Sequence, residues 1–69
     1  MEISQVQRDL LDSLKYLKID TETIVFIMMA CQEQALAQQM MEYIVYMDDN
    51  KEKITAQMLV NKVAEIIKN

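Results

Sequence analysis

Two residue types that shape most protein folds are missing from this chain of 69 residues: it contains no glycine and no proline. Glycine supplies the positive backbone angles of tight hairpin turns, and proline ends helices. Most of the chain consists instead of Gln, Met, Leu, Ile, Lys, Glu and Ala, and most of these are good helix formers. The sequence therefore predicts an all-α protein, with a single helical domain over residues 1–69.

The small size of the chain limits how it can be stabilised. A domain of this length buries only about 60% of the surface that its unfolded chain exposes. The single cysteine, Cys31, excludes an internal disulfide, and the absence of histidine argues against a zinc site. Because Cys31 follows an apolar stretch without nearby cations, we expect it to be a buried, unreactive thiol. Stability must then come from helix packing or from oligomerisation.

Polar residues mark where the first two helices should begin. Ser4 and Gln7 have the spacing of a capping box, so the first helix is expected to begin at Ser4 and to end near Lys18. Asp20 is a favourable N-cap for the second helix. Residues 24–31 are apolar on every side of that helix, which is typical of a central, buried helix.

The apolar faces before and after residues 31–33 do not coincide. At about 100° per residue, the apolar residues of 36–47 are rotated by roughly 140° from those of 24–35. A straight helix packed on one core would not change face, so we predict a break between Cys31 and Glu33. The result is a compact bundle of four short helices. A continuous helix over residues 21–47, and hence three helices, is the alternative because neither Gly nor Pro enforces a break.

The last connection is the clearest loop. Six consecutive polar residues occupy positions 48–53, and Asn50 is expected to adopt the left-handed conformation that ends a helix. Thr55 is then expected to cap the last helix.

Residue types for catalysis are scarce. There is no histidine to act as a base near neutral pH, no glycine for a phosphate-binding loop, and no carboxylate within an apolar pattern that would raise its pKa. The acidic stretch that begins at Asp48 has Lys53 and Leu59 where a calcium-binding EF-hand requires Gly and Glu. The sequence therefore predicts no enzyme, no cofactor, no metal and no small-molecule substrate.

One short motif suggests a different function. Asp12, Ser13 and Leu14 resemble the Asp-Ser-Leu motif of acyl carrier proteins, which are also small, acidic and helical. The resemblance implies that Ser13 would carry phosphopantetheine. In that family the serine opens the second helix and a glycine precedes the motif, whereas here Ser13 falls within the first helix and Leu11 replaces the glycine. An acyl-carrier-like protein remains an alternative.

The charge distribution argues against nucleic-acid binding. The net charge is −4, and residues 19–50 contain six acidic residues and no basic one. Such a segment repels phosphate, and a helix-turn-helix would need a basic face. The longest apolar run is also too short for a membrane span, and no signal peptide is evident at the N-terminus. We expect no nucleic acid, no membrane and a cytoplasmic location.

Two apolar stripes run along the helix expected over residues 33–47. The main stripe comprises Leu36, Met40, Tyr43, Ile44 and Met47. A second stripe lies about 100° away and is formed by Ala37, Met41 and Val45, with Tyr46 beside it. A small domain cannot easily bury both stripes unless the last helix covers the second, and Met and Tyr are enriched at interfaces. We therefore predict a protein interface at Ala37, Met41, Val45 and Tyr46.

These observations favour a non-catalytic protein–protein interaction module. The partner would be a second copy of the chain, giving a homodimer, or another protein. An acidic regulatory or inhibitor protein that binds a basic, nucleic-acid-binding partner is the alternative, since the acidic middle segment favours basic partners.

Overall fold

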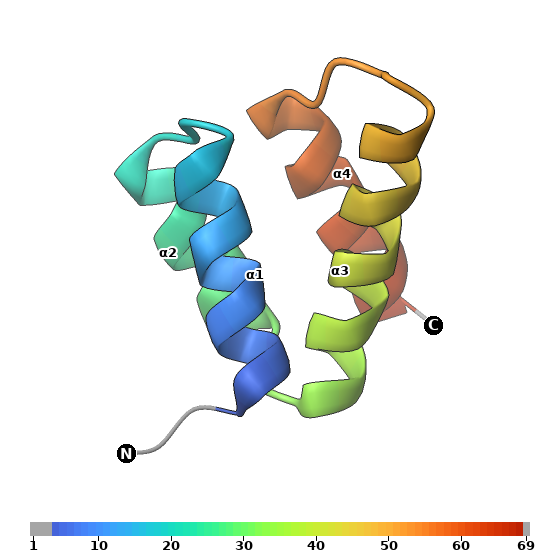
Figure 1. The fold of residues 1–69 in the computed structure, drawn as a ribbon. Helices are drawn as coiled ribbons and strands as arrows, with labels where there is room; N and C mark the ends of the chain where they lie inside the picture. Colours follow the sequence, from blue (N-terminus) through green and yellow to red (C-terminus); the bar gives the residue numbers. More distant parts are fainter. Residues whose placement is uncertain (1–3, 69) are drawn as a thin grey trace.

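The computed structural model describes residues 4–68, which form four helices and no strand (Figure 1). These are α1 (Gln5–Tyr16), α2 (Thr21–Ala30), α3 (Gln34–Asp49) and α4 (Ala56–Lys68). The prediction of an all-α bundle is confirmed. The predicted break is confirmed as well, because α2 ends just before Cys31 and α3 begins just after Glu33; the three-helix alternative is wrong.

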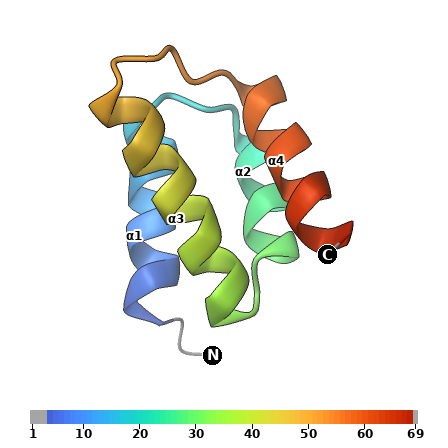
Figure 2. The ribbon, with the colours of Figure 1, turned by 90° about the vertical axis from the view of Figure 1, so that its right-hand side faces the viewer.

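The helices form two layers (Figures 1 and 2). Helix α1 lies beside α3 in one layer, and α2 lies beside α4 in the other, while α1 also packs on α2 and α3 on α4. The chain alternates in direction from helix to helix, so α1 and α3 run parallel to each other. The core between the layers consists of Leu10, Leu14, Ile27, Cys31, Ala37, Met40, Ile44, Leu59, Val63 and Ile66.

Side chains cap three helix starts as the sequence predicts. The Ser4 hydroxyl accepts from the Gln7 amide at 3.3 Å, and the Ser4 amide donates to Gln7 Oε1 at 2.9 Å, which completes the capping box. Asp20 caps α2 by accepting from the amide of Thr23 at 3.0 Å. The Thr55 hydroxyl accepts at 3.2 Å from the amide three residues later in α4. These bonds satisfy amides that have no partner within their helix.

Helix α1 ends in a Schellman motif. The amide of Ile19 donates to the carbonyl of Leu14 at 3.1 Å, and the amide of Lys18 donates to that of Lys15 at 3.0 Å. This motif places Lys18 in the left-handed region, with φ of 61°, where glycine is usual. Because the chain has no glycine, a lysine takes the strained position.

Helix α3 ends in the same way, one residue later than predicted. The left-handed residue is Lys51, with φ of 58°, and its amide donates to the Asp48 carbonyl at 2.9 Å. Asn50 has φ of −90°, so the prediction that it adopts the left-handed conformation is wrong. Its side-chain amide instead donates to the carbonyl of Tyr46 at 2.7 Å, while the residue itself is the C-cap of α3.

One side chain of α1 holds the connection between α2 and α3. Gln7 Nε2 donates to the carbonyl of Gln32 at 2.6 Å and lies 3.2 Å from that of Cys31. Where a helix is interrupted, the carbonyls at its end need new donors. Gln7 supplies them from a distant part of the sequence, so the same residue caps α1 and stabilises the break.

The prediction that α2 is a central, buried helix is wrong. Only Ile27 is buried within α2. On the opposite side of the helix, Val25, Phe26 and Met29 are 50%, 46% and 65% exposed. The physical reason is that a two-layer bundle has no central position, since each helix contacts two neighbours and leaves its outer side uncovered.

Candidate interaction surfaces

The structure divides the four residues predicted as an interface. Ala37 is fully buried in the core, so placing it on the interacting surface is wrong. The reason is that α1 packs along α3 and covers this part of the second stripe, whereas the last helix was the one alternative cover that the sequence suggested. Met41 is half-buried against the core, and its Sδ accepts from the hydroxyl of Ser13 at 3.7 Å. Val45 and Tyr46 remain on the surface, 49% and 64% exposed.

The surface residues of this set lie in a groove between α1 and α3. Two hollows, of about 450 and 690 Å³, run along the outer side of the contact between these helices and share Val45 in their lining. We call them together the α1–α3 groove. The hydrophobic residues that line it are Val6, Leu17, Met41, Ile44 and Val45, and two tyrosines, Tyr16 and Tyr46, stand beside them.

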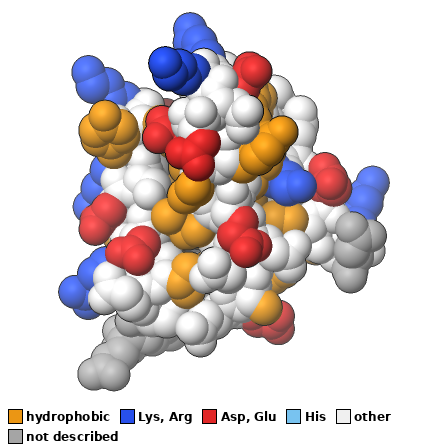
Figure 3. Space-filling model, turned by 45° about the vertical axis from the view of Figure 1, so that its right-hand side comes forward, with side chains coloured by type: hydrophobic (Ala, Val, Ile, Leu, Met, Phe, Trp, Pro, Cys, Tyr) orange, Lys and Arg blue, Asp and Glu red, His pale blue; other side chains and the backbone are white. Residues whose placement is uncertain are grey.

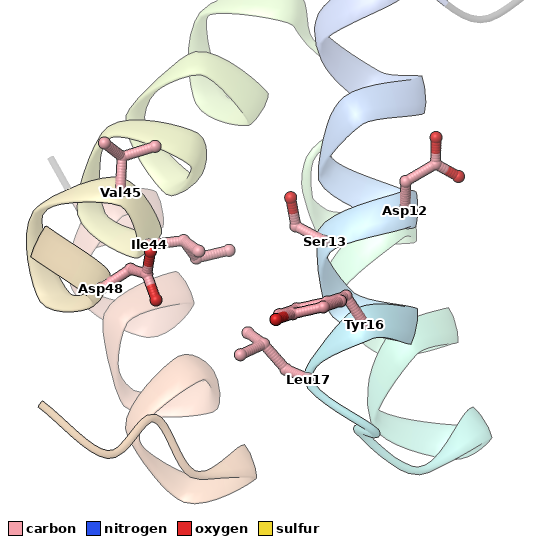
Figure 4. A pocket seen from close by; sticks show the side chains of 7 residues that line it. All are labelled: Asp12, Ser13, Tyr16, Leu17, Ile44, Val45 and Asp48. Carbon is pink, nitrogen blue, oxygen red and sulfur yellow. The ribbon is translucent and has the colours of Figure 1, made fainter. Parts of the chain in front are cut away.

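Figure 4 shows how side chains from both helices face one another across the first hollow. Two side chains, Ser13 of α1 and Leu17 at its C-terminal cap, lie on the side that faces Ile44 of α3. The ring of Tyr16 extends between the two helices. Ser13 is the smallest of these side chains, and its hydroxyl donates to Met41 Sδ of α3.

The groove is strongly acidic. Its lining contains five of the eleven acidic residues of the chain and none of its seven lysines and arginines. The five carboxylates belong to Asp9, Asp12, Glu42, Asp48 and Asp49. On the face of the molecule centred on α3, hydrophobic side chains are flanked by Asp and Glu (Figure 3). Because like charges gather on both flanks, the groove has a negative potential.

Most of these carboxylates have no partner within the described part of the chain. Asp9 accepts from the side-chain amide of Gln5 at 2.8 Å. Within the described part of the chain, the ion pair joins Lys62 to Glu65, and both lie outside the groove. The remaining four carboxylates of the groove are therefore available to an external cation.

The contribution of α1 to the groove was missed from the sequence. Asp9, Asp12 and Tyr16 follow one another at intervals of three and four residues, which places them on one side of α1. That spacing was a usable signal for an acidic face. What it could not reveal was that this face lies beside Val45 and Tyr46 of α3.

A second surface lies on α2. Met29 follows Val25 by four residues and Phe26 by three, so the three side chains lie on one side of the helix. We call these three residues the α2 face. Glu22 is the one charged residue within α2, in its first turn. Exposed apolar patches of this kind often mark sites of protein interaction.

Neither a metal-binding cluster nor an exposed thiol is found among residues 4–68. No group of three His, Cys, Asp or Glu residues within residues 4–68 is arranged to hold a metal ion. Burial raises the pKa of the Cys31 thiol, because desolvation disfavours the thiolate. Ser13 lies in the third turn of α1, half-buried, rather than at the start of a helix. No helix in the described part of the chain is long and apolar enough to span a membrane.

Comparison with known proteins gives no family. No protein-family model matches the chain, and no curated protein or solved structure is significantly similar to it. The two surfaces are therefore the observations on which a function can be argued.

Proposed function

We propose that the chain is a non-catalytic protein–protein interaction module that self-associates as a homodimer through the α2 face. The observation that carries this proposal is the exposure of Val25, Phe26 and Met29 side by side on one helix. A helix that needed only to cover a monomeric core would have polar residues on its outer side.

Charge supports a second copy as the occupant of this surface. The chain carries a net charge of −4, and five of its carboxylates line the α1–α3 groove. Two copies that met through their grooves would bring these like charges together, which costs free energy. The α2 face carries none of these five carboxylates, and Glu22 is the one charged residue of its helix, so two copies meet there with less repulsion than through their grooves. A two-fold dimer uses the same surface on both copies.

The size of the α2 face predicts a weak dimer. Completely burying a Val, Phe or Met side chain contributes roughly 1.5–3 kcal/mol, and these are about half exposed, so each contributes about 1 kcal/mol. The three side chains of each copy then offset an association cost of at least about 4 kcal/mol with little to spare. We therefore expect monomer and dimer to exchange with protein concentration.

The experiment is light scattering over a wide concentration range on the wild type, Val25→Asp and Val45→Asp. The two valines are matched, since they are 50% and 49% exposed and both lie within helices. We expect the wild-type mass to rise toward that of a dimer, Val25→Asp to stay monomeric with unchanged helix content, and Val45→Asp to behave as the wild type.

Two results would count against the proposal. A wild type that remains monomeric at every concentration would remove self-association. If Val45→Asp alone abolished the dimer, the interface would lie on α3, as the second apolar stripe of the sequence predicted, and not on α2.

One observation favours the alternative of an acidic regulatory protein that binds a basic partner. It is the gathering of carboxylates along the α1–α3 groove. The two proposals use different surfaces, so one chain can self-associate through α2 and bind a partner between α1 and α3.

A further inference from the structure

We propose that the α1–α3 groove binds an amphipathic, basic helix of a partner protein. The apolar side of that helix would lie over Met41 and Val45, and its Lys and Arg side chains would meet the carboxylates on both flanks. This proposal does not depend on the dimer, because it concerns the opposite layer of the bundle.

The length of the groove fits a helix. Its lining residues extend along α1 from Gln5 to the C-cap residue Leu17, and along α3 from Gln34 to Asp49. At 1.5 Å per residue these stretches span about 18 and 23 Å. A partner helix of about 12 to 16 residues would therefore be matched in length. Recognition of an amphipathic helix in an apolar groove is a recurrent mode of peptide binding.

The floor of the groove suits an apolar helix face. Ile44 is nearly buried and forms rigid packing, whereas Met41 and Val45 are accessible to a ligand. The thioether of Met41 packs partly against the core and accepts a weak hydrogen bond from Ser13, and its flexibility lets it adapt to different apolar side chains. Tyr46, beside them, offers both an aromatic ring and a hydroxyl.

The flanks of the groove determine the charge of the partner. Asp9 and Asp12 lie on the α1 side, and Glu42, Asp48 and Asp49 on the α3 side. An apolar ligand without charges would leave these carboxylates beside an uncharged surface, and an acidic ligand would be repelled. A helix with Lys or Arg on both sides of an apolar stripe complements them best.

The same charges disfavour the other occupants of such a groove. Nucleic acid and anionic lipid surfaces carry negative charge, as does the corresponding groove of a second copy. Exposed ion pairs contribute little individually and are weakened by salt, so binding should be moderate, fast and sensitive to ionic strength.

The test uses two synthetic peptides of about 16 residues and fluorescence anisotropy. One peptide has leucines along one face and lysines on both flanks, and in its twin each lysine is replaced by glutamate. We expect the lysine peptide to bind at low salt, at least about tenfold more tightly than its twin, and to weaken as salt is added. In NMR spectra, the backbone amide signals that shift when the lysine peptide binds should be those of residues in α1 and α3.

A matched pair of variants locates the site. Val45→Arg places bulk and positive charge in the groove, whereas Gln39→Arg makes the same change at an exposed residue of α3 that does not line it. We expect Val45→Arg to weaken binding of the lysine peptide by at least about tenfold and Gln39→Arg to change it by less than about twofold.

Three results would overturn the proposal. Equal binding of the two peptides would show that charge does not select the partner. Equal effects of the two arginine variants, or amide shifts confined to α2, would show that the peptide binds elsewhere. No binding of the lysine peptide at low salt would show that the groove does not accept a basic helix.

Discussion

Replacing Gln7 by glutamate separates what the sequence suggests from what the structure requires. Glutamate is the usual third residue of a capping box, and negative charge near a helix N-terminus is stabilising. From the sequence alone, Gln7→Glu should therefore be neutral or stabilise the protein by about 0.3–1 kcal/mol. In the structure, however, Gln7 also donates to the two backbone carbonyls that follow α2.

The expected loss follows from the atoms that face Gln7 Nε2. The carbonyl oxygens of Gln32 and Cys31 lie 2.6 and 3.2 Å from this nitrogen. Glutamate keeps the oxygen that accepts from the Ser4 amide, but it replaces the donor by a charged oxygen that faces two carbonyls. Two hydrogen bonds contribute about 0.5–1.5 kcal/mol each, and the repulsion adds to their loss. Against the small dipole gain, we expect a net destabilisation of about 1–2 kcal/mol.

The assay is urea and thermal unfolding of dilute protein, followed by far-ultraviolet circular dichroism. The expected loss corresponds to a decrease in Tm of about 4–8 °C per kcal/mol for a domain of this size. Gln34→Glu is the control, because Gln34 is the first residue of α3, is exposed and makes no such contact. At low pH the stability of Gln7→Glu should come closer to that of the wild type, since a protonated carboxyl can donate a hydrogen bond again. If Gln7→Glu and Gln34→Glu proved equally stable, Gln7 would not hold the break.

Three further predictions concern single residues. Lys18→Gly should stabilise the protein by up to about 1 kcal/mol in urea unfolding, because glycine adopts its positive φ without strain, whereas Lys15→Gly, inside α1, should cost about 1 kcal/mol. Hydrogen bonds from the hydroxyl and amide of Thr23 hold the pKa of Asp20 below its ordinary value. The ionised carboxylate therefore contributes its full stability above the ordinary pKa, and this stability is lost as pH falls through the lower pKa of the folded state. As pH is lowered, the Tm of Asp20→Asn should thus fall less steeply than that of the wild type. Burial raises the pKa of the Cys31 thiol, so Ellman's reagent should react far more slowly with the native protein than in urea, and equal rates would contradict its burial.

The local rules of helix ends account for most of what the sequence predicted correctly. Ser4, Asp20 and Thr55 each cap a helix through a side chain that accepts from the amide three residues later, so the necessary information lies within one turn. The break at residues 31–33 was also predictable, because the two apolar faces are rotated relative to each other. Neither inference needs knowledge of distant contacts.

Contacts between distant segments explain the errors. The burial of Ala37 depends on α1 packing against α3, and no feature of residues 33–47 indicates which neighbour covers the second stripe. The role of Gln7 at the break similarly joins positions that are 24 and 25 residues apart. The exposed side of α2 was missed because periodicity cannot identify the inner face of a helix that is apolar on every side.

The apolar residues on every side of α2 give a last prediction: truncating two of them, which the sequence pattern does not distinguish, should lower stability by very different amounts. Ile27→Ala should destabilise the protein by about 2–5 kcal/mol, because Ile27 is fully buried and its removal leaves a cavity. Met29→Ala, two residues away, should change stability by less than about 0.5 kcal/mol in urea unfolding, because Met29 is 65% exposed.

Protein concentration distinguishes the two roles assigned to α2. In dilute protein, where the monomer dominates, Met29→Ala should match the wild type, whereas at high concentration the wild type should gain stability from the dimer and the variant should gain less. If Ile27→Ala and Met29→Ala lowered the free energy of unfolding by similar amounts in dilute protein, α2 would be buried on both sides within one chain. The conclusion that α2 has an exposed apolar side, and with it the proposed dimer surface, would then be wrong.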